Sequence, residues 1–355
     1  MTEANERLLK VLTFGAGALG TYIGGSLALH GHDVVFLETP AVADTLRTNG
    51  LHLKLKEKDH SISNPQVASS LDEVLSAGPF DVVIFAIKSF DTSSAAQNLA
   101  PYSDLFSAII SFQNGVDKEA VLASFIPQEK VIAGTVTSAI GRLAAGDIVL
   151  QRKRGIGIAG NHPLAGDLVD VFNAAGLNAR LYRFAADMKW SKMVTNLIAN
   201  ATAAILNMTP AEIFEHPGLF RLEVYQLREA LKVMEAQEIQ TVDLPGTPVR
   251  ALSFAIRTLP MTLSRSLLKN AVGSGRGGKM PSFHIDLYNG RGKTEVNYLN
   301  GAVVRHGEQA GVDTPVNRLL TETLLALTNG ELPLATFDRQ PEKLLSAFKE
   351  MITPG

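Results

Sequence analysis

From Lys10 onward the sequence alternates short apolar, β-branched runs with longer amphipathic segments, and this alternation constrains the fold more than any other feature. It is typical of βαβ units and predicts a parallel sheet. The predicted strands are nearly continuous apolar runs, as expected where helices cover both faces of a sheet. They span residues 11–14, 34–37, 82–87, 108–112 and 131–135, with helices predicted over 18–30, 39–49, 91–99 and 118–125.

After residue 140 the pattern changes. Gly146-Asp147 lies between two β-type runs and predicts a hairpin that caps the sheet, followed by a helix over 168–175 and a strand over 177–182. From Asp187 the periodicity is helical. With 355 residues, 46% of them hydrophobic, the chain can bury two cores. We therefore predict the α/β class, with an N-terminal Rossmann-type dinucleotide-binding domain (1–183) and an all-helical C-terminal domain (184–355) for substrate binding and catalysis.

A glycine-rich motif directly follows the first predicted strand and opens the first predicted helix. Its residues are Gly15, Ala16, Gly17, Ala18, Leu19 and Gly20. In such a motif the first glycine permits a tight turn, the second lets the backbone approach a pyrophosphate, and the third allows close helix packing. The helix N-terminus offers N–H groups to the anion. We therefore predict dinucleotide binding.

Three polar residues follow predicted strands and are candidates for cofactor contacts. Glu38 ends the second strand, where a carboxylate would bind ribose hydroxyls and repel a 2′-phosphate, which favours NADH. A solvated glutamate is the alternative, and Arg47 or Lys88 would supply positive charge for NADPH. Lys88 and Asn114 lie where strand ends face the ligand crevice, although a surface lysine and an Asn-Gly turn are the plainer interpretations.

In the helical segment 187–206 a polar stripe is formed by Lys192, Asn196 and Asn200, which recur every four residues and so share one face. The rest of the segment is apolar, and asparagine is unfavourable to bury without partners. The stripe therefore lines a polar cavity or, alternatively, faces solvent. A lysine in such a cavity would protonate a carbonyl oxygen as hydride arrives.

Composition narrows the function classes. The net charge of -2 gives no reason to expect nucleic acid or an anionic membrane as partner. The absence of cysteine excludes a disulfide framework and a thiolate nucleophile, and no metal site is predicted. No membrane span is found, so a cytoplasmic protein is expected. The stretch 273–279 resembles a P-loop, but Met280 stands at the position where a P-loop has the Ser or Thr that binds magnesium. No phosphate-binding site is therefore predicted there.

Taken together and in this order, these motifs resemble the ketopantoate reductase family. The resemblance is carried by the motif Gly15–Gly20, by Gln113-Asn114-Gly115, by Trp190-Ser191-Lys192 with Asn196 and Asn200, and by Ser282 followed by Thr294-Glu295. It implies NAD(P)H-dependent reduction of 2-dehydropantoate (ketopantoate) to pantoate in pantothenate biosynthesis.

The resemblance also implies roles on the substrate side. Lys192 would be the general acid, and Asn196 and Asn200 would orient it and the substrate. Ser282 would bind the substrate carboxylate. Glu295 would bind the substrate hydroxyl by a hydrogen bond and lie near the cofactor ribose. Without the resemblance, Glu295 is a helix-terminal acid and Ser282 a turn hydroxyl.

On the cofactor side, the resemblance implies that Asn114 contacts cofactor and substrate and that Ala139 offers a backbone contact. Family members often carry an arginine just after the second strand, where Thr39 follows Glu38 here. The coenzyme usual in the family is therefore NADPH, whereas Glu38 in this chain favours NADH.

The chain also departs from the family on the substrate side. A further substrate-binding asparagine falls at Pro210, and Asn207 is not a clean substitute. The stretch 241–280 is long and basic, which is typical of a solvated helix face, a lid or a dimer surface. The basic residues of this stretch are Arg250, Arg257, Arg265, Lys269, Arg276 and Lys279.

Two alternative functions stay open, a reductase of another 2-oxo acid and a non-catalytic dinucleotide sensor. A homodimer is a candidate assembly.

Overall fold

The computed structural model describes residues 8–260 and 279–352. Contacts divide the chain into two compact units. The first comprises Met1–Lys189 and Leu244–Thr247, and the second comprises Trp190–Asp243 and Pro248–Gly355. The division falls within helix α7 (Ala185–Leu197), whereas residue 183, where we place the domain boundary from the sequence, lies in the connection just before this helix.

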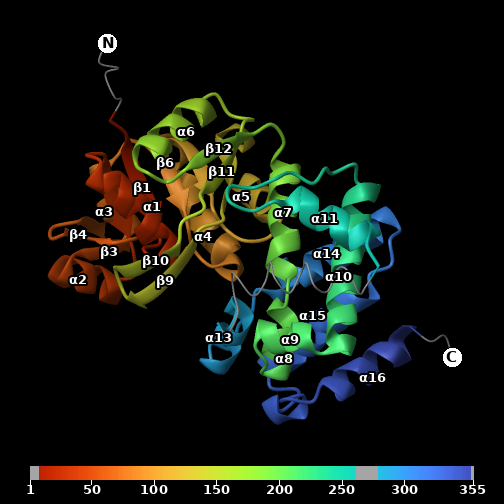
Figure 1. Ribbon diagram of the computed structural model, residues 1–355. Helices are drawn as coiled ribbons and strands as arrows, with labels where there is room; N and C mark the ends of the chain where they lie inside the picture. Colours follow the sequence, from red (N-terminus) through yellow and green to blue (C-terminus); the bar gives the residue numbers. More distant parts are fainter. Residues whose placement is uncertain (1–7, 261–278, 353–355) are drawn as a thin grey trace. The chain divides into compact units, whose positions relative to one another are not determined.

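The first unit is built on an eight-stranded sheet with strand order β12-β11-β8-β7-β6-β1-β2-β5 (Figure 1). Neighbouring strands are parallel except β11 and β8. The strands are β1 (Lys10–Phe14), β2 (Asp33–Leu37), β5 (Gln66–Ala68), β6 (Phe80–Phe85), β7 (Phe106–Ser111), β8 (Val131–Val136), β11 (Ile156–Ala159) and β12 (Ala179–Tyr182). Each of the five predicted strands is present.

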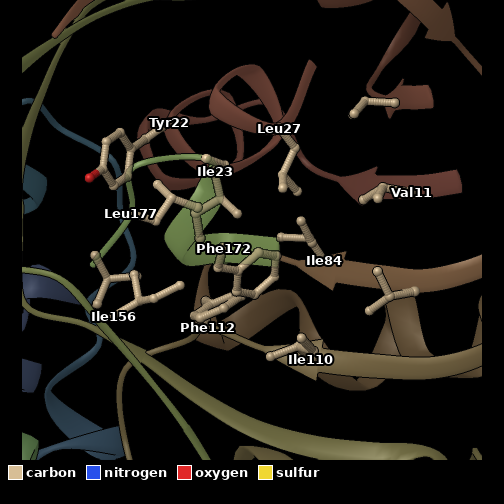
Figure 2. Close-up of a cluster of buried hydrophobic side chains, with 14 of the residues drawn as sticks. Val11, Tyr22, Ile23, Leu27, Ile84, Ile110, Phe112, Ile156, Phe172 and Leu177 are labelled. Atoms are coloured by element: carbon tan, nitrogen blue, oxygen red, sulfur yellow. The ribbon is translucent and has the colours of Figure 1, made fainter. Parts of the chain in front are cut away.

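Helices cover both faces of this sheet, which explains the nearly continuous apolar strands. Successive strand residues alternate between two buried clusters, so that Val11 packs on one face and Leu12 on the other. Figure 2 shows the first cluster, where Ile84 and Ile110 of the sheet lie near Ile23 of α1 and Phe172 of α6. The helices of this unit are α1 (Ala18–Leu29), α2 (Pro40–Asn49), α3 (Leu71–Ala77), α4 (Thr92–Leu99), α5 (Lys118–Ala123) and α6 (Ala165–Ala174).

A second sheet, with strand order β4-β3-β10-β9, packs against α1. Its strands are β3 (Leu51–Leu55), β4 (Lys58–Ile62), β9 (Ala139–Ala144) and β10 (Asp147–Arg152). The hairpin at Gly146 is present, but the prediction that it caps the main sheet is wrong. Its β10 instead pairs in parallel with β3, and Leu53 of β3 packs against Gly25 of α1. Since α1 contacts both sheets, its central residues, from Gly20 to Leu27, are all buried.

The second unit is helical within the described residues (Figure 1). Its helices are the end of α7, α8 (Asn200–Leu206), α9 (Pro210–Glu215), α10 (Pro217–Ala236), α11 (Val249–Thr258), α13 (Ser282–Tyr288), α14 (Asn300–Ala310), α15 (Pro315–Thr328) and α16 (Pro341–Ile352). The predicted fold class, an α/β Rossmann-type domain followed by a helical domain, is confirmed. Among the described helices none is long and apolar enough to cross a bilayer.

The basic stretch is only partly described. Arg250 and Arg257 are exposed on α11, where Arg257 approaches Glu235 at 3.7 Å and donates to Leu231 O at 3.2 Å. Lys279 is exposed before α13. The P-loop-like residues 273–278, together with Arg265, Lys269 and Arg276, lie outside the described residues.

Candidate functional site

The glycine-rich motif forms the loop between β1 and α1. Gly15 has φ 95°, a conformation that favours glycine, and its N–H donates to Leu37 O at 3.0 Å. A Cβ at Gly20 would collide with the carbonyl oxygen of Gly15, so this glycine is needed for the close turn. A Cβ at Gly17 would meet nothing within 4 Å, and Gly17 begins α1 without a side-chain cap. The N-terminus of α1 is therefore open to an anion, and the loop fits a dinucleotide pyrophosphate.

Glu38 follows β2 and reaches back to this loop. Its Oε1 accepts a hydrogen bond from Ala16 N at 2.6 Å, and its Oε2 accepts one from Thr39 N at 3.2 Å. Arg47, the alternative cation, is held elsewhere, because its guanidinium donates to Asp44 at 3.1 Å and to Glu73 at 3.0 Å. The carboxylate thus lies next to the glycine-rich loop without Arg47 beside it. Sequence reasoning placed Glu38 at this strand end but missed its contact with Ala16.

The loops that carry Lys88 and Asn114 follow neighbouring strands and are hydrogen-bonded to each other. Ser89 Oγ donates to Asn114 O at 3.2 Å. The buried Gln113 amide donates to Ile87 O at 3.0 Å, to Lys88 O at 3.3 Å and to Thr92 Oγ1 at 2.9 Å. The structure therefore brings the Lys88 and Asn114 backbones together at one end of the sheet.

Two buried lysines brace the same loops, and sequence reasoning missed both. Lys189 is only 4% exposed, and its ammonium contacts Gln113 O at 2.8 Å, Gly134 O at 3.3 Å and Glu119 Oε1 at 2.9 Å. Lys118 donates to Ser89 O at 3.0 Å. Charged groups are rarely buried unless paired, so these contacts hold the loops firmly. A lysine placed between Met188 and Trp190 was the available signal for Lys189.

Ala139 begins β9, directly after a tightly bonded turn. Ser138 Oγ accepts hydrogen bonds from Arg154 N and Gly155 N, both at 3.0 Å. Thr137 Oγ1 donates to Gly155 O at 3.0 Å. The backbone at Ala139 is therefore held in place, as the predicted cofactor contact requires.

In the second unit, Lys192 and Asn196 lie one turn apart on α7, but the prediction of one continuous helix to residue 206 is wrong. The helix ends at Leu197, and Asn200 begins α8. Between them Ala199 adopts a left-handed conformation with φ 49°. The reason is a long-range contact, because Ala199 N donates to the Glu223 carboxylate at 2.7 Å instead of continuing the helical ladder.

This break places Asn200 against α13, where Ser282 is the first residue. Asn200 Oδ1 accepts a hydrogen bond from Phe283 N at 3.2 Å, and its Nδ2 lies 3.5 Å from Ser282 Oγ. The Asn200 side chain is buried, while Ser282 is exposed. Two of the predicted substrate residues are thus in contact, although they are 82 positions apart in the sequence.

Glu295 is buried at the N-terminal end of the short 3₁₀ helix η4 (Val296–Tyr298), which packs against α14 and α15. The expected start of a regular α-helix at this point is displaced, since α14 begins only at Asn300. The structure therefore places Glu295 on a connection between α13 and α14.

Pro210 and Asn207, the two positions where the chain departs from the family, make structural contacts within the helical unit. Pro210 is the first residue of α9, which is capped by Thr209 and Glu212. The Asn207 side chain contacts His284 Nε2 at 2.8 Å and Asp338 at 3.2 Å. Neither position therefore offers the family's asparagine amide in an equivalent way.

Comparison with known proteins identifies the family. The model of the family "Ketopantoate reductase PanE/ApbA" matches residues 11–162, and that of its C-terminal part matches residues 185–328. A 2-dehydropantoate 2-reductase of Archaeoglobus fulgidus is 27% identical over 91% of this chain and 99% of its own length.

Solved structures agree on the fold. The crystal structure of a PanE/ApbA family ketopantoate reductase from Ralstonia eutropha JMP134 aligns with a TM-score of 0.77 and 24% identity, over 91% of this chain and 99% of its own. D-mandelate dehydrogenase, solved with NADH and anilino(oxo)acetate, aligns with a TM-score of 0.74 and 21% identity over the same shares. The resemblance drawn from the motifs is confirmed, and the chain belongs to the ketopantoate reductase family of NAD(P)-dependent oxidoreductases.

Proposed function

We propose that this oxidoreductase reduces ketopantoate to pantoate, a step in pantothenate biosynthesis, with Lys192 as general acid. The observation that carries the proposal is the contact of Asn200 with Ser282 and Phe283, in the same helical unit as Lys192 and Asn196. A serine hydroxyl and an asparagine amide side by side suit a substrate carboxylate, because both offer hydrogen-bond donors to its oxygens.

The reduced nicotinamide supplies the hydride, and the protein supplies the proton and the orientation. Lys192 donates its proton to the carbonyl oxygen as negative charge develops there. Asn196, one turn away, orients the ammonium and the substrate. Glu295 accepts a hydrogen bond from the substrate hydroxyl. Its buried position on a short connection suits a group that must hold one hydroxyl in a fixed place.

We further propose that the coenzyme is NADH rather than NADPH. Glu38 sits beside the glycine-rich loop, where its carboxylate would meet a 2′-phosphate as a like charge. Arg47 is engaged by Asp44 and Glu73, and Thr39 stands where family members often carry arginine. Of the two cations considered, Arg47 and Lys88, only Lys88 is then left to offset the repulsion.

The test is to follow NADH and NADPH oxidation by the purified protein with ketopantoate and with a panel of other 2-oxo acids, including pyruvate, 2-oxoisovalerate and phenylglyoxylate. We expect the highest kcat/KM for ketopantoate with NADH. A protein that is active only with another acid in the panel would overturn the substrate assignment, and one that strongly favours NADPH would overturn the coenzyme assignment.

The second candidate is reduction of a different 2-oxo acid by the same residues. It is favoured by Pro210 at the position of a family asparagine and by the engagement of Asn207 with His284 and Asp338. A substrate that lacks the hydroxyl of ketopantoate would not need Glu295. The same panel distinguishes the two candidates.

A further inference from the structure

We infer that Glu223 is a positioning residue for the oxo-acid half of the site, because it fixes the turn between α7 and α8 that aims Asn200 at α13. The inference rests on the proposed function in that Asn196 and Asn200 are taken as substrate-binding residues. No role for Glu223 follows from the motifs. Its importance comes from a contact that only the fold creates.

The Glu223 carboxylate binds the turn from both sides. Glu223 is 0% exposed on α10. Its Oε2 accepts from Ala199 N at 2.7 Å, and its Oε1 accepts from Thr202 Oγ1 at 2.5 Å. The Gln226 amide donates to Oε2 at 2.6 Å and to Leu197 O at 3.3 Å, so that it joins the carboxylate to the last residue of α7.

The turn needs such an external partner. Ala199 has φ 49°, a region that L-residues other than Gly, Asn and Asp rarely adopt. Alanine also lacks a side chain that could cap α8. In a continuous helix Ala199 N would donate to Thr195 O, four residues earlier. Glu223 replaces that bond, and it thereby makes the break compatible with a satisfied, buried N–H group.

The break decides where Asn200 points. In a continuous helix Asn196 and Asn200 would lie one above the other on one face. With the turn in place, Asn200 instead accepts from Phe283 N at 3.2 Å and lies next to Ser282. Loss of the Glu223 carboxylate favours the continuous helix and moves Asn200 away from α13.

Gln226 is itself fixed by neighbouring helices. Its Oε1 accepts from Asn300 Nδ2 at 3.0 Å, and Asn300 also donates to Asn317 Oδ1 at 3.0 Å. The carboxylate and its partners therefore form a buried polar network between α10, α14 and α15. These contacts hold Gln226, and with it the Glu223 carboxylate, in one arrangement.

The test compares Glu223→Leu with Glu229→Leu. Glu229 is a matched control because it is buried on the same helix and bonds to Asn317, but it binds the start of α15 rather than the turn. The first readout is amide hydrogen exchange of the segment Ser282–Tyr288. We expect Glu223→Leu to lose protection at Phe283, whose N–H is bonded to Asn200, and Glu229→Leu to keep it.

The second readout is kinetics with the best oxo acid of the panel. We expect kcat/KM to fall on the order of 10²-fold in Glu223→Leu through misplacement of Asn200, with NADH affinity unchanged and with Glu229→Leu near wild type. Glu223→Gln should retain activity, because Thr202 can accept from the new amide nitrogen while the amide oxygen serves Ala199. Equal behaviour of the two leucine variants in either readout would overturn the inference.

If Glu223→Leu does not fold, Thr202→Val removes one hydrogen bond to the same carboxylate and should lower Phe283 protection and kcat/KM in the same direction. A wild-type value for both would overturn the inference. A wild-type protein without activity on ketopantoate is a separate outcome. It would refute the proposed substrate and leave the exchange measurement as the test of Glu223.

Discussion

Glu229 makes the stability of the helical unit depend on pH in a direction opposite to that of an ordinary ion-paired carboxylate. Its side chain is 8% exposed on α10. Burial raises the pKa of Glu229 from 4.5 to about 7, against the lowering effect of hydrogen bonds from Asn317 and Val316 and of the Lys232 charge. The backbone bonds measure 2.8 Å from Val316 N and 2.9 Å from Asn317 N.

The sign follows from proton binding in the two states. Below pH 4.5 the carboxyl is protonated in both folded and unfolded chains and makes no pH-dependent contribution. Between pH 4.5 and about 7 the unfolded chain releases the proton while the folded chain keeps it, so stability falls as the pH rises. A difference of roughly 2.5 pKa units at 1.36 kcal/mol each corresponds to about 3 kcal/mol lost by neutral pH.

The assay is urea unfolding of wild type and Glu229→Gln between about pH 4 and pH 8, since glutamine does not titrate and other groups cancel in the difference. Trp190 is the single tryptophan of the chain and lies in the second unit, so its fluorescence reports on the unit that holds Glu229. We expect the free energy of unfolding of wild type, relative to the variant, to decrease by about 3 kcal/mol over this range. A difference that is flat or that increases with pH would refute the reasoning.

Three further predictions concern the proposed chemistry. Lys192→Ala should lower kcat by about 10²- to 10⁴-fold, because general acid catalysis is lost, and should leave NADH affinity nearly intact; near-normal turnover would remove Lys192 from the mechanism. Ser282→Ala and Glu295→Gln should each raise KM for the oxo acid, and loss of NADH binding with preserved substrate affinity would contradict this. Glu38→Ala combined with Thr39→Arg should shift the kcat/KM ratio toward NADPH, and an unchanged ratio would show that Glu38 faces away from the ribose.

The parts of the fold that the sequence predicts well are those determined by local patterns. Strands β1, β2, β6, β7 and β8 are continuous apolar runs, and each is found within two residues of its predicted ends. The short strands at 51–68 were not predicted. In β3 a strand signal was present and was missed, because Leu51, Leu53 and Leu55 alternate with polar residues. In β4 the run is largely exposed, and pairing with β3 stabilises it. Periodicity reports burial, so a solvated strand gives little signal.

The same distinction applies to the candidate site. The glycine-rich loop was predictable because two of its glycines, Gly15 and Gly20, meet local steric requirements. The break before Asn200 was not, because its cause is a carboxylate 24 positions later in the sequence. Residues 196 and 200 fit a helical period whether or not the helix continues. The period therefore singled out both residues but placed the second on the wrong face.

The placement of Asn114 shows why tertiary contacts have to be known before a polar loop residue is given a role. Asn-Gly after a strand is first a turn signal, and the same sequence would serve a solvent-exposed turn equally well. Here the carbonyl oxygen of Gln113, the preceding residue, accepts a hydrogen bond from the buried ammonium of Lys189, which is 76 positions away. The side-chain amide of Gln113 donates a hydrogen bond to the neighbouring loop. An exposed turn has no need of a buried lysine, since burying the charge is unfavourable unless its contacts are useful. The bracing itself is therefore the physical argument that the backbone at Asn114 must be held in one place.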